Sequence, residues 1–251
     1  MKFARFTIKD IVSYGIVEGD SITQIEGTPF EDDYALTDIH YNLKEVKLLS
    51  PTLYSKAVCI GLNYKDHAKE FGLPIPTEPV VFLKPDTCLN DPESPIIYPS
   101  ISKRLDYEAE LAIVLKKDCK NVEEAEVSSY ILGYCCANDI TARDLQPKQG
   151  QWTIAKCFDG FLPLGPFIET EFNPSNAVIQ SRVNGEVKQI SNTSNLIFSP
   201  FFLVSYLSKR MTLKKGDVIS TGTPGGISGM KRGDIVEIEI EKLGVLRNTI
   251  G

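Results

Sequence analysis

The chain has 251 residues, enough for one sizeable domain or for one large and one small domain with a substantial core. Hydrophobic residues make up 42% of it and charged residues 24%, as is usual for soluble globular proteins. The formal net charge of -6 argues against nucleic acid or an anionic membrane surface as the main partner. The sequence shows no signal peptide and no apolar run of bilayer-spanning length, so we expect a cytoplasmic protein with no membrane partner.

Histidines and cysteines limit the chemistry that the chain can perform. The six cysteines show no C-x-x-C spacing, and we expect them to be reduced thiols, mostly in the core. The two histidines, His40 and His67, are too few for a zinc site built from several imidazoles. A histidine that acts as a general base must therefore be one of these two.

The N-terminal region has the pattern of a small β-rich unit. Short β-like runs over residues 3–7, 14–17 and 21–25 are separated by turn residues. We therefore predict a small β-rich N-terminal domain over residues 1–50 and a main domain over residues 51–251.

A polar segment after the apolar run 57–61 predicts a short helix from Tyr64 to Phe71 that ends at Gly72. On a helix, His67 and Glu70 lie one turn apart on the same face. A carboxylate beside an imidazole fixes its tautomer and raises its basicity, as a general base requires. The alternative is a solvated helix face, because the neighbouring residues are also charged.

The stretch 105–115 predicts a strand that carries two acids at its start. Glu108 and Glu110 are two residues apart and therefore leave the strand on the same face. Neighbouring carboxylates at the mouth of a buried strand repel each other unless a cation or a proton neutralises them. They indicate either a hard divalent metal held through oxygen or acids that simply face water. Glu237 and Glu239, in the alternating surface strand 235–240, show that such a pair is easily found.

A second group of polar residues follows the apolar run 131–137, which predicts a buried strand after a helix capped by Asn121. Asp139 comes just past that run and is the natural third partner for Glu108 and Glu110. Three carboxylates, with waters or a chelating substrate, approach the six oxygens that a divalent ion prefers. Lys156 lies in a mostly apolar segment, where a lysine is either paired and functional or reaches to the surface along its stem.

The last third of the chain contains a hairpin, a helix and a glycine-rich loop. Asn184-Gly185 between two β-like runs predicts a hairpin, and the apolar spacing over residues 200–209 predicts a helix. The loop 221–226 resembles an anion cradle of backbone N–H groups and hydroxyls, but it lacks the ending of a P-loop. The absence of a G-x-S-x-G motif argues against a serine hydrolase.

In combination, these motifs resemble those of the fumarylacetoacetate hydrolase family. The resemblance is to its branch of small acylpyruvate hydrolases, oxaloacetate decarboxylases and hydroxymuconate-type isomerases, and it extends over roughly residues 50–251. The segments that carry it are Gly61–Glu70, Asp106–Ala112, Asn138–Gln146, Lys156, Val183–Gly185 and Thr221–Pro224.

The resemblance implies an α+β, β-rich fold of several mixed sheets that form a β-roll with few short helices, and it makes residues 51–251 the catalytic domain. It implies a homodimer and a Mg²⁺ or Mn²⁺ site, with Asp106 not among the ligands. The implied metal ligands are Glu108, Glu110 and Asp139. The implied catalytic residues are His67 and Glu70, on a mobile lid, and Lys156. The implied substrate-binding residues are Arg143, Gln146 and Thr223.

The activity that the resemblance implies is metal-dependent hydrolysis of a carbon–carbon bond in small 2,4-diketo acids of the acylpyruvate type. His67, polarised by Glu70, would activate the attacking water, and Lys156 would stabilise the negative charge of a metal-stabilised enolate. One alternative is decarboxylation of oxaloacetate or a related keto diacid, and another is isomerisation of a hydroxymuconate-type diacid. A non-catalytic protein that binds metal and keto acid is less expected, because binding needs no general base.

Overall fold

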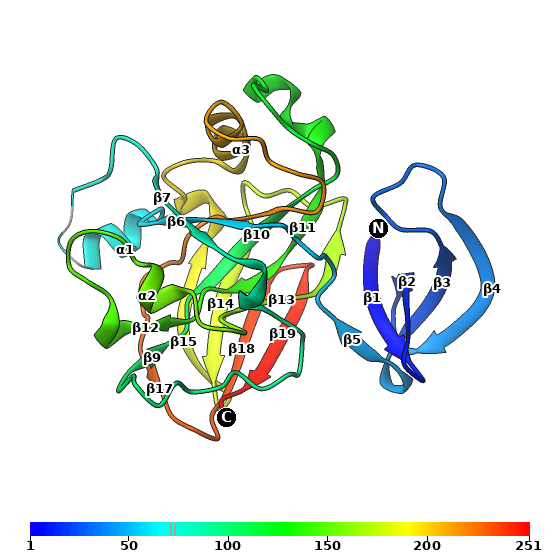
Figure 1. The fold of residues 1–251 in the computed structure, drawn as a ribbon, viewed down its shortest axis with the longest axis horizontal. Coiled ribbons are helices and arrows are strands. Elements are labelled where there is room, and N and C mark those ends of the chain that lie inside the picture. The colour runs from blue at the N-terminus through cyan, green and yellow to red at the C-terminus, as the bar shows by residue number, and fades with distance from the viewer. Residues whose placement is uncertain (71, 73) are drawn as a thin grey trace.

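The computed structural model describes residues 1–70, 72 and 74–251 and shows a β-rich molecule with few short helices (Figure 1). Its largest sheet is open and mixed. From edge to edge this sheet consists of β4 (Ala35–Asn42), β3 (Ser21–Glu26), β2 (Ile11–Glu18), β1 (Lys2–Ile8), β13 (Leu162–Glu169), β11 (Ile131–Asn138), β10 (Ala109–Leu115), β16 (Val218–Ser220), β6 (Ala57–Gly61) and β7 (Val80–Lys84). Two short strands pair with it from the side, β5 (Lys47–Leu49) with β1 and β8 (Leu89–Asn90) with β13.

Two smaller sheets complete the β-structure of the described residues. The first consists of β12 (Thr141–Ala142), β9 (Leu105–Asp106) and β17 (Gly229–Met230), and the second of β15 (Glu186–Asn192), β14 (Val178–Val183), β18 (Ile235–Ile240) and β19 (Gly244–Thr249). The predicted hairpin is confirmed, because β14 and β15 pair across Asn184-Gly185, both with positive φ. The predicted β-rich α+β fold of several mixed sheets is also confirmed.

The helices are short. The α-helices are α1 (Lys65–Glu70), α2 (Thr153–Lys156) and α3 (Pro200–Ser208), and the 3₁₀-helices are η1 (Leu43–Glu45), η2 (Asp86–Cys88), η3 (Glu124–Tyr130), η4 (Arg143–Leu145) and η5 (Thr193–Asn195). The predicted helices at α1 and α3 are confirmed, although Phe71 lies outside the described residues. No helix in the described part of the chain is long and apolar enough to cross a membrane.

The helix predicted after Asn121 differs from the structure. It is the 3₁₀-helix η3, which begins only at Glu124. Asn121 has a φ of 53°, in the left-handed region, whereas an N-cap residue is extended. The prediction that Asn121 caps this helix is therefore wrong.

The acidic stretch 105–115 is divided between two sheets, so the prediction of one continuous strand is wrong. Leu105–Asp106 forms β9 and Ala109–Leu115 forms β10, with Tyr107 and Glu108 between them. Side chains from distant segments replace the missing strand partners at this break. The Asn138 side chain accepts the backbone N–H of Glu108, and the Gln189 side chain accepts that of Ala109, both at 3.0 Å.

The N-terminal strands lie at one end of the molecule, in blue in Figure 1. They include the predicted β-like runs, and they enclose a small core of their own with Phe6 and Ile22. β1 also pairs with β13 through Lys2–Glu169 and Phe3–Ile168, which extends the large sheet into this region. The division of the chain at residue 50 stays a prediction.

The central strand β10 is buried on both faces. Leu111 and Ile113 belong to one hydrophobic cluster, whereas Ala112 and Val114 belong to another on the opposite face. Burying each large side chain contributes about 1.5–3 kcal/mol, so this strand is held rigidly in place. Glu110 therefore projects from one of the most firmly packed parts of the molecule.

Candidate active site

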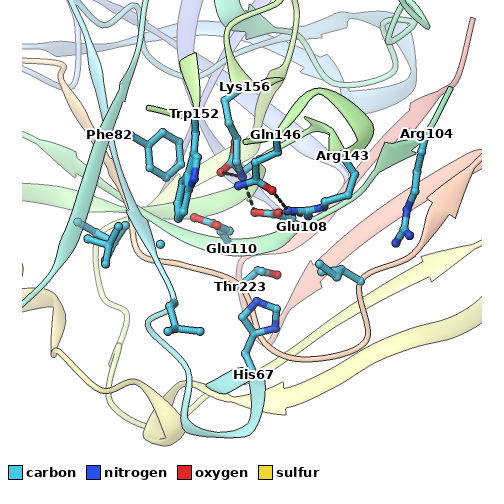
Figure 2. A pocket seen from close by; sticks show the side chains of 16 residues that line it. His67, Phe82, Arg104, Glu108, Glu110, Arg143, Gln146, Trp152, Lys156 and Thr223 are labelled. Carbon is cyan, nitrogen blue, oxygen red and sulfur yellow. Dashed lines mark hydrogen bonds and ion pairs between the residues drawn. The ribbon is translucent and has the colours of Figure 1, made fainter. Parts of the chain in front are cut away.

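A cavity of about 390 Å³ brings most of the predicted site residues together (Figure 2). Eight of the nine predicted residues line it, namely His67, Glu108, Glu110, Asp139, Arg143, Gln146, Lys156 and Thr223. The ninth, Glu70, lies behind His67, with its Oε2 atom 3.6 Å from His67 Nδ1. Segments that are far apart in the sequence thus form one site.

Three buried carboxylates form the floor of this cavity. One ligand oxygen from each of Glu108, Glu110 and Asp139 lies within 4.8 Å of the other two, and these residues are 6%, 1% and 1% exposed. Glu108 precedes β10, Glu110 lies in it, and Asp139 directly follows the neighbouring strand β11. The backbone N–H of Asp139 donates to the Glu108 carbonyl at 3.0 Å, which fixes the two acids side by side.

Two buried lysines face these acids. Lys156 Nζ donates to Glu108 Oε2 at 2.7 Å and to Asp139 Oδ2 at 2.6 Å, and Lys84 Nζ lies 2.5 Å from Asp139 Oδ1. Burial alone would lower the pKa of Lys156, but the carboxylates of Asp139 and Glu108 outweigh it and raise that pKa above its usual value. Lys156 is therefore a buried and paired lysine, and the alternative of a surface lysine is wrong.

Glu108 and Glu110 are in different electrostatic surroundings. Burial would raise the pKa of Glu108, but Lys156 and Arg143 outweigh it and hold that pKa far below its usual value. Burial and repulsion from Asp139 and Glu108 raise the pKa of Glu110 well above its usual value. Its hydrogen bonds within the described residues come from the Ser220 hydroxyl and the Gly222 N–H, both to Oε2.

These surroundings fit a divalent cation. The donor set consists of carboxylate oxygens, which Mg²⁺ and Mn²⁺ prefer. Among the three acids, Glu110 is the one for which the described part of the chain provides no cationic partner. A divalent ion between the three carboxylates would remove the repulsion that raises the pKa of Glu110.

Two arginines surround Asp106 at the edge of the floor. Arg104 binds it through Nε and Nη2 at 2.8 and 3.1 Å, and Arg143 binds it through Nε at 2.8 Å. Arg143 also donates through Nη2 to Glu108 and through Nη1 to Gln146 Oε1, the latter at 2.5 Å. Asp106 is thus neutralised by two guanidinium groups, which agrees with the prediction that it is not a metal ligand.

His67 faces the carboxylates from the opposite side of the cavity (Figure 2). Burial lowers its pKa, although Glu108 and Glu70 oppose that effect, so the imidazole is neutral near pH 7. Glu70 Oε2 also accepts the backbone N–H of Gly226 at 3.1 Å, which holds this carboxylate beside His67. The neutral imidazole is suited to accept a proton. The mobility implied for this segment stays a prediction.

The loop 221–226 does act as a cradle for anions, but those anions are carboxylates of the protein itself. The N–H of Gly222 binds Glu110, and that of Gly226 binds Glu70. Gly222 has a φ of 98°, and a Cβ atom there would lie 2.8 Å from the Cβ atom of Asn63, so only glycine fits. Thr223 accepts a hydrogen bond from Gln189 at 2.8 Å, which leaves its hydroxyl proton available to a ligand.

An aromatic wall closes another side of the cavity. Phe82 and Trp152 meet edge to face at a centroid distance of 5.3 Å. A Cβ atom on Gly61 would lie 2.5 Å from the Trp152 ring, so glycine at this position makes room for the tryptophan. This wall, Arg104 and Lys84 were not identified from the sequence. The sequence does contain a pattern that indicates a buried lysine at position 84, because Lys84 ends an apolar strand just as Lys156 lies in an apolar segment.

Residues 56–251 match the profile of a family described as "Fumarylacetoacetate (FAA) hydrolase C-terminal", and residues 1–51 match one described as "Rv2993c-like, N-terminal". This chain belongs to the fumarylacetoacetate hydrolase family. The predicted resemblance is thereby confirmed, and members of this family are enzymes. The oxygen-rich cluster of Glu108, Glu110 and Asp139 agrees with the divalent-metal dependence that is general in the family.

The proteins similar to this chain include one that is uncharacterized and two that are named after a reaction. The chain is 58% identical over 207 residues to an uncharacterized protein of Archaeoglobus fulgidus, covering 82% of this chain and 83% of that protein. It is 41% identical over 218 residues to "Oxaloacetate tautomerase fahd2, mitochondrial" of Xenopus laevis, covering 82% and 68%. The crystal structure of 5-carboxymethyl-2-hydroxymuconate delta-isomerase from Mycobacterium smegmatis matches with a TM-score of 0.92 at 40% identity, covering 100% and 99% of the two chains.

Proposed function

We propose that this protein is a divalent-metal-dependent enzyme that moves a proton at the carbon beside the keto group of small 2-keto acids, interconverting keto and enol forms. The observation that supports it best is the position of the His67 imidazole, which faces the carboxylate cluster and Lys156 across one cavity. The names of a tautomerase and an isomerase among the relatives denote the same class of reaction.

The carboxylates of Glu108, Glu110 and Asp139 would hold Mg²⁺ or Mn²⁺. When bound, such an ion acts as a Lewis acid that draws electrons from a carbonyl oxygen and makes the neighbouring C–H group more acidic. The ammonium group of Lys156 lies beside the same carboxylates and adds positive charge where the enolate oxygen develops. The hydroxyl of Thr223 can donate a hydrogen bond to the substrate carboxylate.

In this reaction His67 would take the proton from the carbon beside the keto group and deliver it to the enolate oxygen, which gives the enol; the reverse transfer gives the keto form. The carboxylate of Glu70, 3.6 Å from Nδ1, stabilises the imidazolium that exists between the two transfers. The reaction needs no attacking water, and no atom leaves the substrate. One base on one side of the cavity is therefore sufficient.

A second candidate is the hydrolysis of acylpyruvates that the sequence predicted. The aromatic wall of Phe82 and Trp152 suits the apolar acyl group of such a substrate. The same pair of His67 and Glu70 could activate a water molecule instead of a C–H group. Decarboxylation of a keto diacid is the remaining alternative from the sequence, and it would use the same charges around the enolate.

Parallel assays with one preparation separate these reactions. The protein, with Mg²⁺ or Mn²⁺ and with a chelator as control, is given oxaloacetate and acetylpyruvate. We expect metal-dependent acceleration of the keto–enol interconversion of oxaloacetate, followed by the ultraviolet absorbance of the enol. Release of acetate from acetylpyruvate without such acceleration would favour the hydrolase, and release of CO₂ as the main reaction would favour the decarboxylase.

We also propose that the protein is a cytoplasmic homodimer, as the resemblance to the family implies. Light scattering coupled to gel filtration gives the mass of the particle. A mass of twice the 27.9 kDa chain supports the dimer, whereas a monomer at micromolar concentration contradicts it.

A further inference from the structure

Arg104 lines the cavity, but the proposed proton transfer does not use it. Its side chain is 52% exposed, in contrast to the buried lysines of the floor. Both of its hydrogen bonds go to Asp106, from Nε and Nη2. This two-point contact fixes the plane of the guanidinium group. The side chain has therefore already lost its conformational entropy before a ligand binds.

Arg143 and Arg104 differ in how many of their guanidinium nitrogens already donate a hydrogen bond. All three nitrogens of the Arg143 guanidinium group donate within the site, to Asp106, Glu108 and Gln146. Within the described residues, the hydrogen bonds of Arg104 leave its Nη1 atom for a ligand. Of the two arginines in the cavity, Arg104 is therefore the one with a whole guanidinium nitrogen that makes no hydrogen bond within the described residues.

The two ends of the cavity differ in chemistry. Figure 2 shows Arg104 at one end, beyond Arg143, and the rings of Phe82 and Trp152 at the other, with Glu108 and Glu110 between them. A 2-keto acid whose reacting end lies at the carboxylate floor can therefore extend toward a cation or toward an aromatic wall. The group at its distal end decides which direction is favourable.

The net charge around the carboxylate floor favours a substrate with two carboxylates that extends toward the cationic end of the cavity. Once a divalent ion is bound and Glu110 is ionised, four cationic groups face four carboxylates around the floor, so the ion leaves this set with two excess positive charges. The groups are Lys84, Arg104, Arg143 and Lys156 and, opposite them, Asp106, Glu108, Glu110 and Asp139. Glu70 lies behind His67 and is partly exposed, so solvent screens its charge. Two excess positive charges match a substrate with two carboxylates.

We infer that Arg104 binds the distal carboxylate of the substrate and thereby selects 2-keto dicarboxylic acids over 2-keto acids with an apolar tail. This inference rests on the proposed function, because it takes the 2-keto acid end to lie at the carboxylate floor. Arg104 is then the specificity-determining residue of the cavity, and Asp106 positions it.

The kinetic test compares Arg104→Met, which keeps much of the stem and removes the charge, with Arg104→Lys, which keeps the charge. For oxaloacetate we expect Arg104→Met to raise KM roughly 10- to 100-fold with little change in kcat, the loss that a charged hydrogen bond predicts. Arg104→Lys should recover part of this loss, and the KM for acetylpyruvate should stay unchanged. Arg182→Met is the matched control, since Arg182 is also an ion-paired arginine, here with Glu237 and Glu239, but lies outside the cavity.

Binding of unreactive ligands tests the inference independently of turnover. N-Oxalylglycine and N-ethyloxamate share a chelating end and differ in a distal carboxylate against a methyl group. Trp152 is the only tryptophan of the chain and lines the cavity, so its fluorescence reports binding to the Mg²⁺-loaded protein. We expect the wild-type protein to prefer N-oxalylglycine by about 10-fold or more and Arg104→Met to lose that preference.

The outcomes separate this inference from the proposed function. Equal affinity of the wild-type protein for the two ligands, or an unchanged preference in Arg104→Met, overturns the role of Arg104 even if keto–enol activity is present. A preference that depends on Arg104 without any keto–enol activity supports the role of Arg104 and contradicts the proposed reaction.

Discussion

Two strands of this protein carry the same pair of acids at the same spacing. Glu108 directly precedes β10 and Glu110 lies in it, whereas Glu237 and Glu239 both lie in β18. The second pair is partly exposed, and one cation, Arg182, satisfies both acids at 3.0 and 2.5 Å. The first pair is buried and shares its surroundings with a third acid, Asp139.

Burial and the number of acids account for the difference in electrostatics. Hydrogen bonding to Arg182 lowers the pKa of Glu239, as in an ordinary surface ion pair. At the buried pair the two pKa values move in opposite directions, down for Glu108 and up for Glu110. An acidic pair is therefore a candidate metal site where it is buried together with a further acid and one of the three acids has no cationic partner.

The largest expected effect is on the keto–enol rate when the proposed general base, His67, is removed while the acids that would hold the ion remain. His67→Ala should lower the keto–enol rate by about 10²–10⁴-fold, because it removes the proposed general base. Affinity for Mn²⁺, measured by calorimetry, should stay within a few-fold of wild type, since the three carboxylates remain. His40→Ala, at the exposed histidine of β4, is the matched control. A rate near that of wild type for His67→Ala would contradict the role of His67.

The next effect is on the free energy of unfolding when a cation beside each acidic pair is removed. Lys156→Met should lower the free energy of unfolding of the metal-free protein by about 3 kcal/mol, because it leaves buried carboxylates with fewer cationic partners. Arg182→Met should cost at most about 1 kcal/mol, as is usual for a solvent-screened pair. Urea denaturation measures both. Equal losses in the two variants would show that burial does not distinguish the two pairs.

Removing one acid from each pair tests which pair holds the ion. Glu110→Gln should weaken Mn²⁺ binding by about 100-fold or more, because it removes a charged ligand, and even residues behind the ligands contribute about 10- to 100-fold. Glu239→Gln should leave Mn²⁺ affinity unchanged. Calorimetric titration with Mn²⁺ gives both constants. Unchanged affinity in Glu110→Gln would remove Glu110 from the metal site.

The smallest effect is a shift in pH dependence. Because burial lowers the pKa of His67 below its usual value of about 6.5, the imidazole stays neutral as the pH falls through 6.5. A neutral base is the active form, so kcat/KM should hold from pH 8 to 6.5 and fall only at lower pH. The profile is measured with saturating Mg²⁺. A decline whose midpoint lies above pH 6.5 would contradict a buried, neutral His67.

Much of the local structure follows from patterns in the sequence. Alternation and turn residues identified the first three strands of the N-terminal region, but not β4 or β5, and they identified the hairpin at Asn184-Gly185. The spacing of apolar residues placed the helix at Pro200, where Ser199 caps Phe202 N–H. The position of Asp139 just after a buried strand identified it as a partner for the acids of the neighbouring strand. These features depend on residues close together in the chain.

The features that the sequence missed depend on distant residues. The break in the acidic stretch occurs because side chains of Asn138 and Gln189 accept the backbone groups of residues 108 and 109. Arg104 is bound by its near neighbour Asp106, but the cavity that it lines is formed by residues from distant segments of the chain. No local pattern encodes which distant donor or acceptor reaches a given group.

The sequence alone was enough to predict the hairpin at Asn184-Gly185, the helix at Pro200 and three N-terminal strands, and its resemblance to a known family singled out Glu108, Glu110, Asp139, Lys156 and His67 as expected site residues. Local propensity and spacing along the chain are sufficient for the elements, but not for the roles of the site residues. Only the tertiary structure decided that Glu108 is held charged, that Glu110 is left without a cation, and that Glu237 and Glu239 are satisfied by Arg182. The physical reason is that the charge state of an acid depends on its burial and on the cations around it, and folding brings both from distant parts of the chain.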